Sequence, residues 1–161
     1  MNFTLQIKGL EEFVNDSKRA GLNVKPMMTQ AMQRATLKVK NAIQENITAK
    51  GITFQGSLRR SVQVNQATWD KGVVGVGEKY GSVVEAGRRP GGKMPPVKAI
   101  ERWAEIKLNA KGAGFVIAKK IQRQGTKAQP FVEPAFRSEA QYVVDQFGIA
   151  ANMIMSQMAG K

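Results

Sequence analysis

The alternation of apolar and polar residues predicts strands in two parts of the chain. Phe3, Leu5 and Ile7 alternate with polar residues, and Gly9 ends this pattern. A second alternation covers residues 57–67, and the turn sequence around Asp70 separates it from the valine-rich segment 71–77. A period of two is typical of a half-buried strand, and a short polar turn between two such runs predicts a β-hairpin. We therefore expect a strand over 3–8 and a hairpin over 57–67 and 71–77.

Apolar residues three and four positions apart predict helices in the rest of the chain. The longest early pattern covers residues 24–49, and its methionines are better explained by core packing than by an adaptable contact surface. The C-terminal pattern starts at Pro130, and Gly148 is a point at which that helix can bend. The predicted helices cover residues 10–19, 24–49, 80–86, 96–108, 115–124 and a long segment from 130 onward.

These elements together predict one α+β domain over residues 1–161, with a small antiparallel sheet made of the N-terminal strand and the central hairpin. A Gly/Pro-rich basic loop is expected at 87–96 and a mobile loop at 50–57. Three short strands provide little surface for so much amphipathic helix. We therefore expect neighbouring subunits to cover part of the apolar helical surface.

The composition restricts the possible chemistry. The 161 residues include 25 Lys and Arg and 12 Asp and Glu, for a net charge of +13, and neither Cys nor His. Disulfides, thiolate metal sites and Cys or His catalysis are thus excluded. No apolar run is long enough for a membrane span and no signal peptide is evident, so we expect a soluble protein made in the cytoplasm.

The positive charge is spread along the sequence, with an excess of +4 in residues 1–50, +5 in 51–110 and +4 in 111–161. Such a balance fits a polyanionic partner, because neutralising phosphates releases counterions. It fits equally well a charged surface that keeps the protein soluble. The sequence leaves both interpretations open.

The remaining acidic residues do not form a convincing catalytic set. Asp70, Glu78 and Lys79 place a nuclease-like combination at one end of the hairpin, but such residues recur by chance in hairpins. Glu101 and Glu105 share a helix face, which a solvated charged surface explains more simply. No glycine pattern matches a nucleotide-binding loop. We predict no catalytic residue, no cofactor and no metal site.

The chain opens with a predicted strand that leads into Gly9-Leu-Glu-Glu-Phe13 and a long helix, and three short motifs follow in order. They are Gly56-Ser-Leu-Arg-Arg-Ser61, Tyr80-Gly-Ser-Val-Val-Glu-Ala-Gly87 and Pro130-Phe-Val-Glu-Pro-Ala-Phe136. In this order and spacing the chain resembles the phage tail-component family of long-tailed double-stranded DNA phages, which contains head–tail joining, tail-completion and minor tail proteins. The segments 95–104 and 121–126 resemble an insertion in the minor-tail subgroup. Two positions depart from the pattern: Gly81 replaces alanine, and Arg88 replaces threonine.

The resemblance implies a structural virion protein without catalytic activity, located at the phage neck or the head-proximal end of the tail after synthesis in the host cytoplasm. It implies a homo-oligomeric ring, often of six copies, that contacts other neck and tail proteins, with no membrane partner. Genome DNA in the lumen would be met without sequence specificity. The alternative is a basic accessory protein that binds DNA through phosphate contacts.

Two groups of residues are candidates for contacts in such an assembly. Arg88, Arg89 and Lys93 lie in the Gly/Pro loop, which in a ring faces either the DNA backbone or the acidic rim of an adjacent ring; alternatively the loop is simply solvated. Phe131, Pro134 and Phe136 offer aromatic rings held by prolines, which suits an anchor in a neighbouring subunit. The alternative for these rings is that they fill the core of their own subunit.

Overall fold

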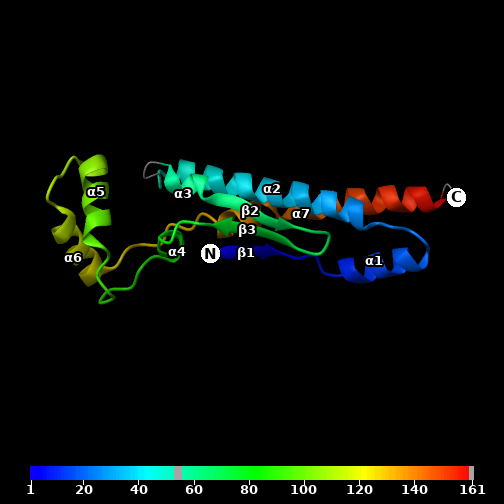
Figure 1. The fold of residues 1–161 in the computed structure, drawn as a ribbon, viewed down its shortest axis with the longest axis horizontal. Coiled ribbons are helices and arrows are strands. Elements are labelled where there is room, and N and C mark those ends of the chain that lie inside the picture. The colour runs from blue at the N-terminus through cyan, green and yellow to red at the C-terminus, as the bar shows by residue number, and fades with distance from the viewer. Residues whose placement is uncertain (53–55, 160–161) are drawn as a thin grey trace.

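The protein is elongated, with a three-stranded sheet, two long helices beside it and a pair of shorter helices that project from one end (Figure 1). The structure, a computed structural model, describes residues 1–52 and 56–159. The elements are β1 (Asn2–Leu5), α1 (Leu10–Arg19), α2 (Lys25–Ala49), α3 (Ser57–Arg60), β2 (Val62–Ala67), β3 (Gly72–Val76), α4 (Gly81–Ala86), α5 (Val97–Leu108), α6 (Gly114–Gln124) and α7 (Glu133–Ala159).

The sheet is antiparallel, with the strand order β1-β3-β2. Phe3 pairs with Val74 on one side of β3, and Val62 pairs with Val76 on the other. All five residues of β3 are buried, because this strand has a neighbour on each edge and a helix over one face. The α+β class and the small antiparallel sheet expected from the sequence are confirmed.

The long helix α2 lies directly against the sheet, and a glycine permits the close approach. A Cβ on Gly72 would lie 2.8 Å from the Met32 sulfur and 2.5 Å from the Thr36 hydroxyl oxygen. That hydroxyl donates a hydrogen bond to the Met32 carbonyl, 2.6 Å away, so its burial leaves no unsatisfied polar group. The methionine stripe of α2 is therefore core, as the sequence pattern favoured.

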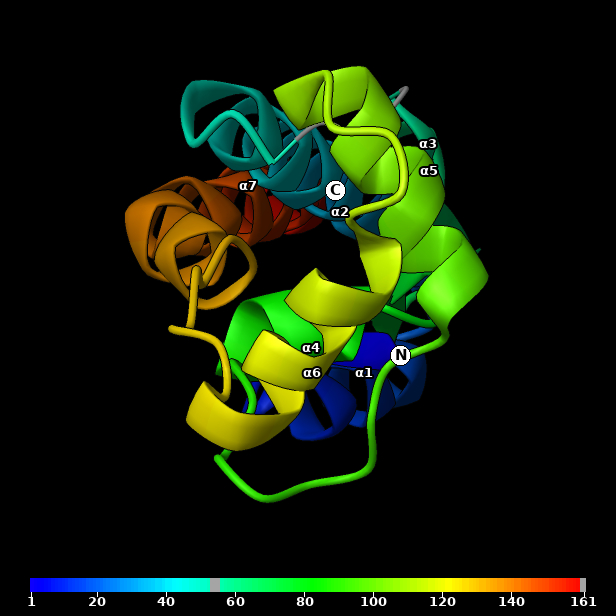
Figure 2. The ribbon, with the colours of Figure 1, turned by 90° about the vertical axis from the view of Figure 1, so that its left-hand side faces the viewer.

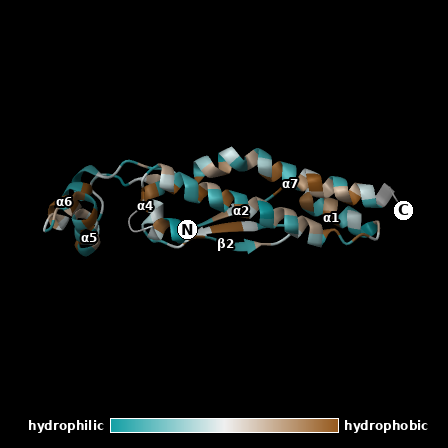
Figure 3. Cartoon of the chain, turned by 90° about the horizontal axis from the view of Figure 1, so that it is seen from above, coloured by the Kyte–Doolittle hydropathy of each residue, from teal (hydrophilic) through white to brown (hydrophobic). Residues whose placement is uncertain are grey.

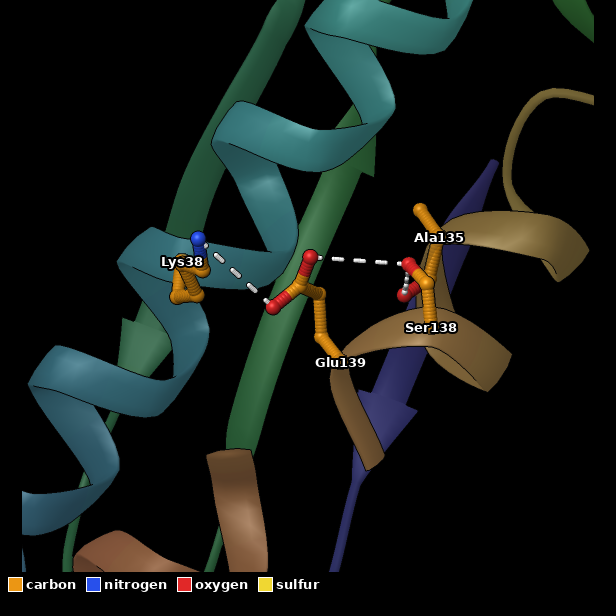
Figure 4. A network of polar contacts seen from close by, with 4 residues as sticks. All are labelled: Lys38, Ala135, Ser138 and Glu139. Atoms are coloured by element: carbon orange, nitrogen blue, oxygen red, sulfur yellow. Dashed lines mark hydrogen bonds and ion pairs between the residues drawn. The ribbon is translucent and has the colours of Figure 1, made fainter. Parts of the chain in front are cut away.

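The second long helix, α7, runs alongside α2 in the opposite direction (Figure 1). Figure 4 shows a polar contact between the two helices, in which the Lys38 ammonium of α2 lies 3.8 Å from a Glu139 carboxylate oxygen of α7. The Ser138 hydroxyl bonds to the Ala135 carbonyl, 3.2 Å away, and lies 3.5 Å from Glu139. This network flanks an apolar seam whose buried α7 members are Ala135, Val143, Phe147, Ala150 and Ile154.

Two strand boundaries differ from the sequence expectations by three residues or more. Residues 57–60 form the helical turn α3, and the strand β2 starts only at Val62. The apolar spacing could not separate these cases, since Leu58 and Val62 are four residues apart and share a face in a helix and in a strand alike. The first strand ends at Leu5 instead of residue 8. Of the loop predicted at 50–57, residues 53–55 lie outside the described residues.

The helices α5 and α6 pack against each other at one end of the molecule, away from the sheet. Among the described elements they form extensive contacts only with each other. Figure 3 shows this pair beyond the end of the main body, and Figure 2 shows it from the side that faces outward. We call residues 87–128, which comprise the two helices and the chain segments leading to and from them, the arm.

Candidate functional site

The arm carries most of the net positive charge of the protein. Residues 87–128 contain eleven Lys and Arg and two Asp and Glu, a net charge of +9 out of the +13 of the whole chain. The expectation of an evenly spread charge is therefore wrong. The boundary between segments 51–110 and 111–161 divides the arm, and both segments also contain more neutral flanking residues. The net charge of each segment therefore does not reveal that the positive charge is concentrated in the arm.

Backbone hydrogen bonds hold together the two chain segments at the base of the arm, residues 87–93 and 122–127, which we call the neck of the arm. Arg88 and Thr126 exchange two hydrogen bonds, each with an N–O distance of 2.9 Å. The Gly91 N–H donates to the Gln122 carbonyl at 2.7 Å. These bonds close the arm at its base, so that α5 and α6 leave the body as one unit.

The neck depends on a glycine at position 125. Gly125 has φ +72° and ψ −165°, a conformation that is essentially restricted to glycine, and a Cβ there would overlap the Arg88 carbonyl oxygen. Gly125→Ala should therefore open the neck at a cost of about 2 kcal/mol or more. We expect amide hydrogen exchange across residues 97–124 to rise by at least about 30-fold, with the long helices unaffected, because the arm does not support the core.

Gly112→Ala is the matched control for this prediction. Gly112 also has a positive φ, +83°, but a Cβ there would meet no atom within 4 Å. The Gly112→Ala substitution should lower the stability of the arm only through local backbone strain, on the order of 1 kcal/mol. Equal exchange rates in the arm of the Gly125→Ala variant and of the wild type would contradict the role assigned to the neck.

The structure places all three predicted basic residues on this neck. Arg88 is half-buried, while Arg89 and Lys93 are exposed. Arg88, at the position where the resemblance expects threonine, pairs through its backbone with Thr126. None of the three cations forms a salt bridge within the described residues.

Sequence reasoning missed the other cations that the fold brings to this end of the molecule. The exposed residues Lys119, Lys120 and Arg123 lie on α6, and Lys127 follows it. They are more than twenty residues from the Arg88–Lys93 loop in the sequence, and only the pairing at the neck joins the two groups. A charge count over 87–128 would have revealed them, but that window becomes obvious only from the fold.

One of the two acidic residues of the arm has a structural task. The Glu101 carboxylate on α5 accepts hydrogen bonds from the backbone N–H groups of Gly112 and Gly114 at the start of α6. An anion at a helix start satisfies otherwise unpaired N–H groups and complements the helix dipole. The interpretation of Glu101 as part of a solvated charged face is therefore wrong, whereas Glu105 is exposed.

The second and third sequence motifs meet at the start of α7. The Glu85 carboxylate accepts hydrogen bonds from the backbone N–H of Phe131 at 2.7 Å, of Val132 at 3.0 Å and of Glu133 at 3.1 Å. The Gln129 N–H also donates to the Val84 carbonyl at 2.8 Å. One glutamate side chain thus binds the N-terminal end of α7 and fixes where that helix begins.

The first motif is linked to the second by a hydrogen bond between two side chains. The hydroxyl groups of Ser57 and Tyr80 lie 2.8 Å apart. Leu58, from the same helical turn, is fully buried, and a Cβ on Gly81 would lie 3.3 Å from its Cδ1 atom. The glycine that replaces alanine in the second motif therefore sits in a tightly packed position.

The aromatic residues of the third motif belong to the interior of this chain. Phe131 has no exposed surface, and its carbonyl accepts a hydrogen bond from the Asn46 amide at 3.1 Å. Phe136 is partly buried, with its ring 6.2 Å from that of Phe3, and Pro134 is half-buried. Phe131 therefore presents no surface to a neighbouring subunit, as the alternative of a core role requires.

The described part of the chain offers no other recognisable chemical site. No group of three or more acidic, His or Cys side chains is placed to hold a metal ion within it. None of its helices is long and apolar enough to cross a membrane. Comparisons of the chain with protein-family models, with curated proteins and with solved structures found no match.

Proposed function

We propose that this chain is a structural protein of a phage virion that forms a ring at the neck or head-proximal end of the tail. The contacts among the three motifs carry this proposal. Ser57 meets Tyr80, and Glu85 binds the backbone of residues 131–133. Short motifs that matched by chance would have no reason to form one connected unit, whereas motifs of a shared fold would.

Exposed apolar side chains support the existence of neighbouring copies. Val144, Met153 and Met155 on α7 are each at least half exposed, as are Phe115 and Val116 on α6. Single exposed apolar residues are ordinary, but five of the seven large apolar side chains that are at least half exposed in the described residues lie on these two helices, and the other two are Leu37 on α2 and Leu108 on α5. A heterologous interface repeated about an axis would cover such faces and close into a ring.

The oligomeric state tests the proposal directly. We expect the purified chain, alone or with tail tubes, to form a closed assembly whose native mass is a small multiple of the 17.6 kDa subunit. Averaged particle images should show a ring. A chain that stays a monomer at high concentration, and that in mature particles touches no second copy, would contradict the proposal.

The basic residues at the base of the arm, Arg88, Arg89 and Lys93, provide a functional test. Replacing Arg88, Arg89 and Lys93 together with Ala should leave the fold intact, with each change costing no more than about 0.5 kcal/mol, because the side chains form no salt bridge among the described residues. Head–tail joining should be impaired, which the yield of infectious particles in a complementation assay measures. An unchanged yield of infectious particles would count against a role of these three arm residues in head–tail joining.

The concentration of charge favours a second candidate, a basic accessory protein that binds DNA through phosphates. The net charge of +9 on a projecting arm is the observation that supports it. The two candidates differ in assembly: an accessory protein would act as a small soluble species and would be absent from mature particles. Mass analysis of purified virions distinguishes them.

A further inference from the structure

We propose that the part of the arm formed by α6 and the neck is a binding surface for the phosphate backbone of duplex DNA. The surface, which we call the α6–neck strip, comprises Arg88, Arg89, Lys93, Lys119, Lys120, Arg123 and Lys127. It goes beyond the proposed ring, because it concerns a property of the single chain that holds in either assembly state.

The helix geometry turns the α6 cations outward. Ala118 is buried and Ile121 is half-buried, because they face α5. At 100° per residue, Lys119, Lys120 and Arg123 lie within a 100° arc on the opposite side of the helix. All three are exposed. The outer face of α6 therefore presents three cations within about one turn.

The neck brings further cations close to the C-terminal end of α6. Arg123 lies two residues before Gly125, and the backbone pair between Arg88 and Thr126 places the two chain segments of the neck side by side. Paired residues on neighbouring strands have Cα atoms about 5 Å apart, so the backbones of Arg88 and Arg89 lie close to those of Thr126 and Lys127, and successive side chains there project to alternate sides of the pair. Seven cations thus lie on or beside the C-terminal half of α6, and the segments that carry them contain no acidic residue.

The other side of the arm differs in its charge balance. Lys98, Arg102 and Lys107 of α5 share their helix with Glu101 and Glu105. Glu105 lies three residues from Arg102, close enough on a helix to weaken its field. A polyanion would therefore prefer the α6 side, where attraction is not opposed by local carboxylates.

The chemistry of the strip points to a duplex backbone as the ligand. Lysine and arginine on exposed stems suit phosphate groups, which position a protein without reading bases. The segments 88–93 and 119–127 contain no aromatic residue on which bases of a single strand would stack. A regular row of phosphates is the partner that seven cations without aromatic or acidic neighbours fit best.

Two variants of equal charge test the proposal in the full-length chain. The strip variant carries Lys119→Gln, Lys120→Gln and Arg123→Gln, and the control carries Lys98→Gln, Arg102→Gln and Lys107→Gln. Both remove three charges from the same arm and keep good helix formers, and circular dichroism checks that both fold. Binding to a random-sequence 30-bp duplex is measured by fluorescence anisotropy between 50 and 200 mM salt.

We expect the wild-type chain to lose about 10³-fold in affinity over this salt range, as for about six phosphate contacts. The strip variant should bind on the order of 10²-fold more weakly at 0.1 M salt, with the magnitude of its salt slope smaller by about 2.7. The control should change affinity by less than about fivefold, because the α5 cations lie outside the strip and Glu101 and Glu105 on the same helix offset part of their field.

Three outcomes would overturn the proposal. If the wild type does not bind the duplex at 50 mM salt, the strip faces another partner, such as an acidic protein surface. If both variants lose equal affinity, binding reflects the total charge of the arm and not one face. If a single-stranded oligonucleotide binds more tightly than the duplex, the ligand class is wrong. Because native mass is measured on the same samples, failure of the ring proposal would be recognised separately.

Discussion

Phe131→Ala should destabilise the protein by about 4 kcal/mol. The phenyl ring of Phe131 is fully buried beside α2 and the start of α7. Removing a buried phenylalanine side chain costs about 3–5 kcal/mol, because contacts are lost and a cavity remains. Urea denaturation followed by circular dichroism would measure the change. A loss of this size is a large part of the stability of a typical domain, so low expression of the variant is expected as well.

Phe115→Ala is the control for this substitution. Phe115 lies on α6 with 54% of its surface exposed, so its truncation should change the free energy of unfolding by no more than about 0.5 kcal/mol. The same pair of variants tests the anchor hypothesis. An anchor at Phe131 would leave the isolated chain stable and abolish only its assembly, which is the opposite of the result expected from the structure.

Glu85→Ala should cost about 3 kcal/mol. Its carboxylate accepts three backbone hydrogen bonds at the start of α7. A single hydrogen bond to a charged group contributes about 1.5–3 kcal/mol, and three bonds to one carboxylate contribute less than three times that amount. Water reaches part of this site, so the total is well below a simple sum. Urea denaturation gives the free energy, and hydrogen exchange in residues 131–137 should rise most.

The conservative variant Glu85→Gln separates charge from shape. Its amide keeps one oxygen acceptor but loses the negative charge that complements the helix N-terminus, so we expect a smaller loss of about 1 kcal/mol. Glu105→Ala, at an exposed glutamate on α5, should change stability by less than about 0.5 kcal/mol. If Glu85→Ala were as stable as Glu105→Ala, the capping role would be disproved.

Local patterns predicted the helices and strands well because they arise from interactions between near neighbours. The helix predicted over 24–49 is observed at Lys25–Ala49, and the one predicted over 96–108 is observed at Val97–Leu108. The error at residues 57–60 arose where one spacing fits two structures. In such a segment the spacing does not select between a strand and the helical turn that is observed, in which Leu58 is fully buried.

The candidate site was predicted in part. The basic character of Arg88, Arg89 and Lys93 is visible in the sequence, and so is the order of the three motifs. The contribution of Lys119, Lys120 and Arg123 was not, because these residues approach the loop only through the pairing of Arg88 with Thr126. The function of Glu85 was also hidden, since its partners lie 46–48 residues further along the chain.

The amino-acid sequence by itself determined the α+β class, the absence of Cys and His chemistry, and the excess of positive charge, because these follow from composition and short-range periodicity. Only the tertiary structure decided where that charge gathers, which glutamates bind helix ends, and that Phe131 is core. The physical reason is that electrostatic fields and burial depend on distances in space, and chain folding brings together residues whose separation in sequence carries no such information.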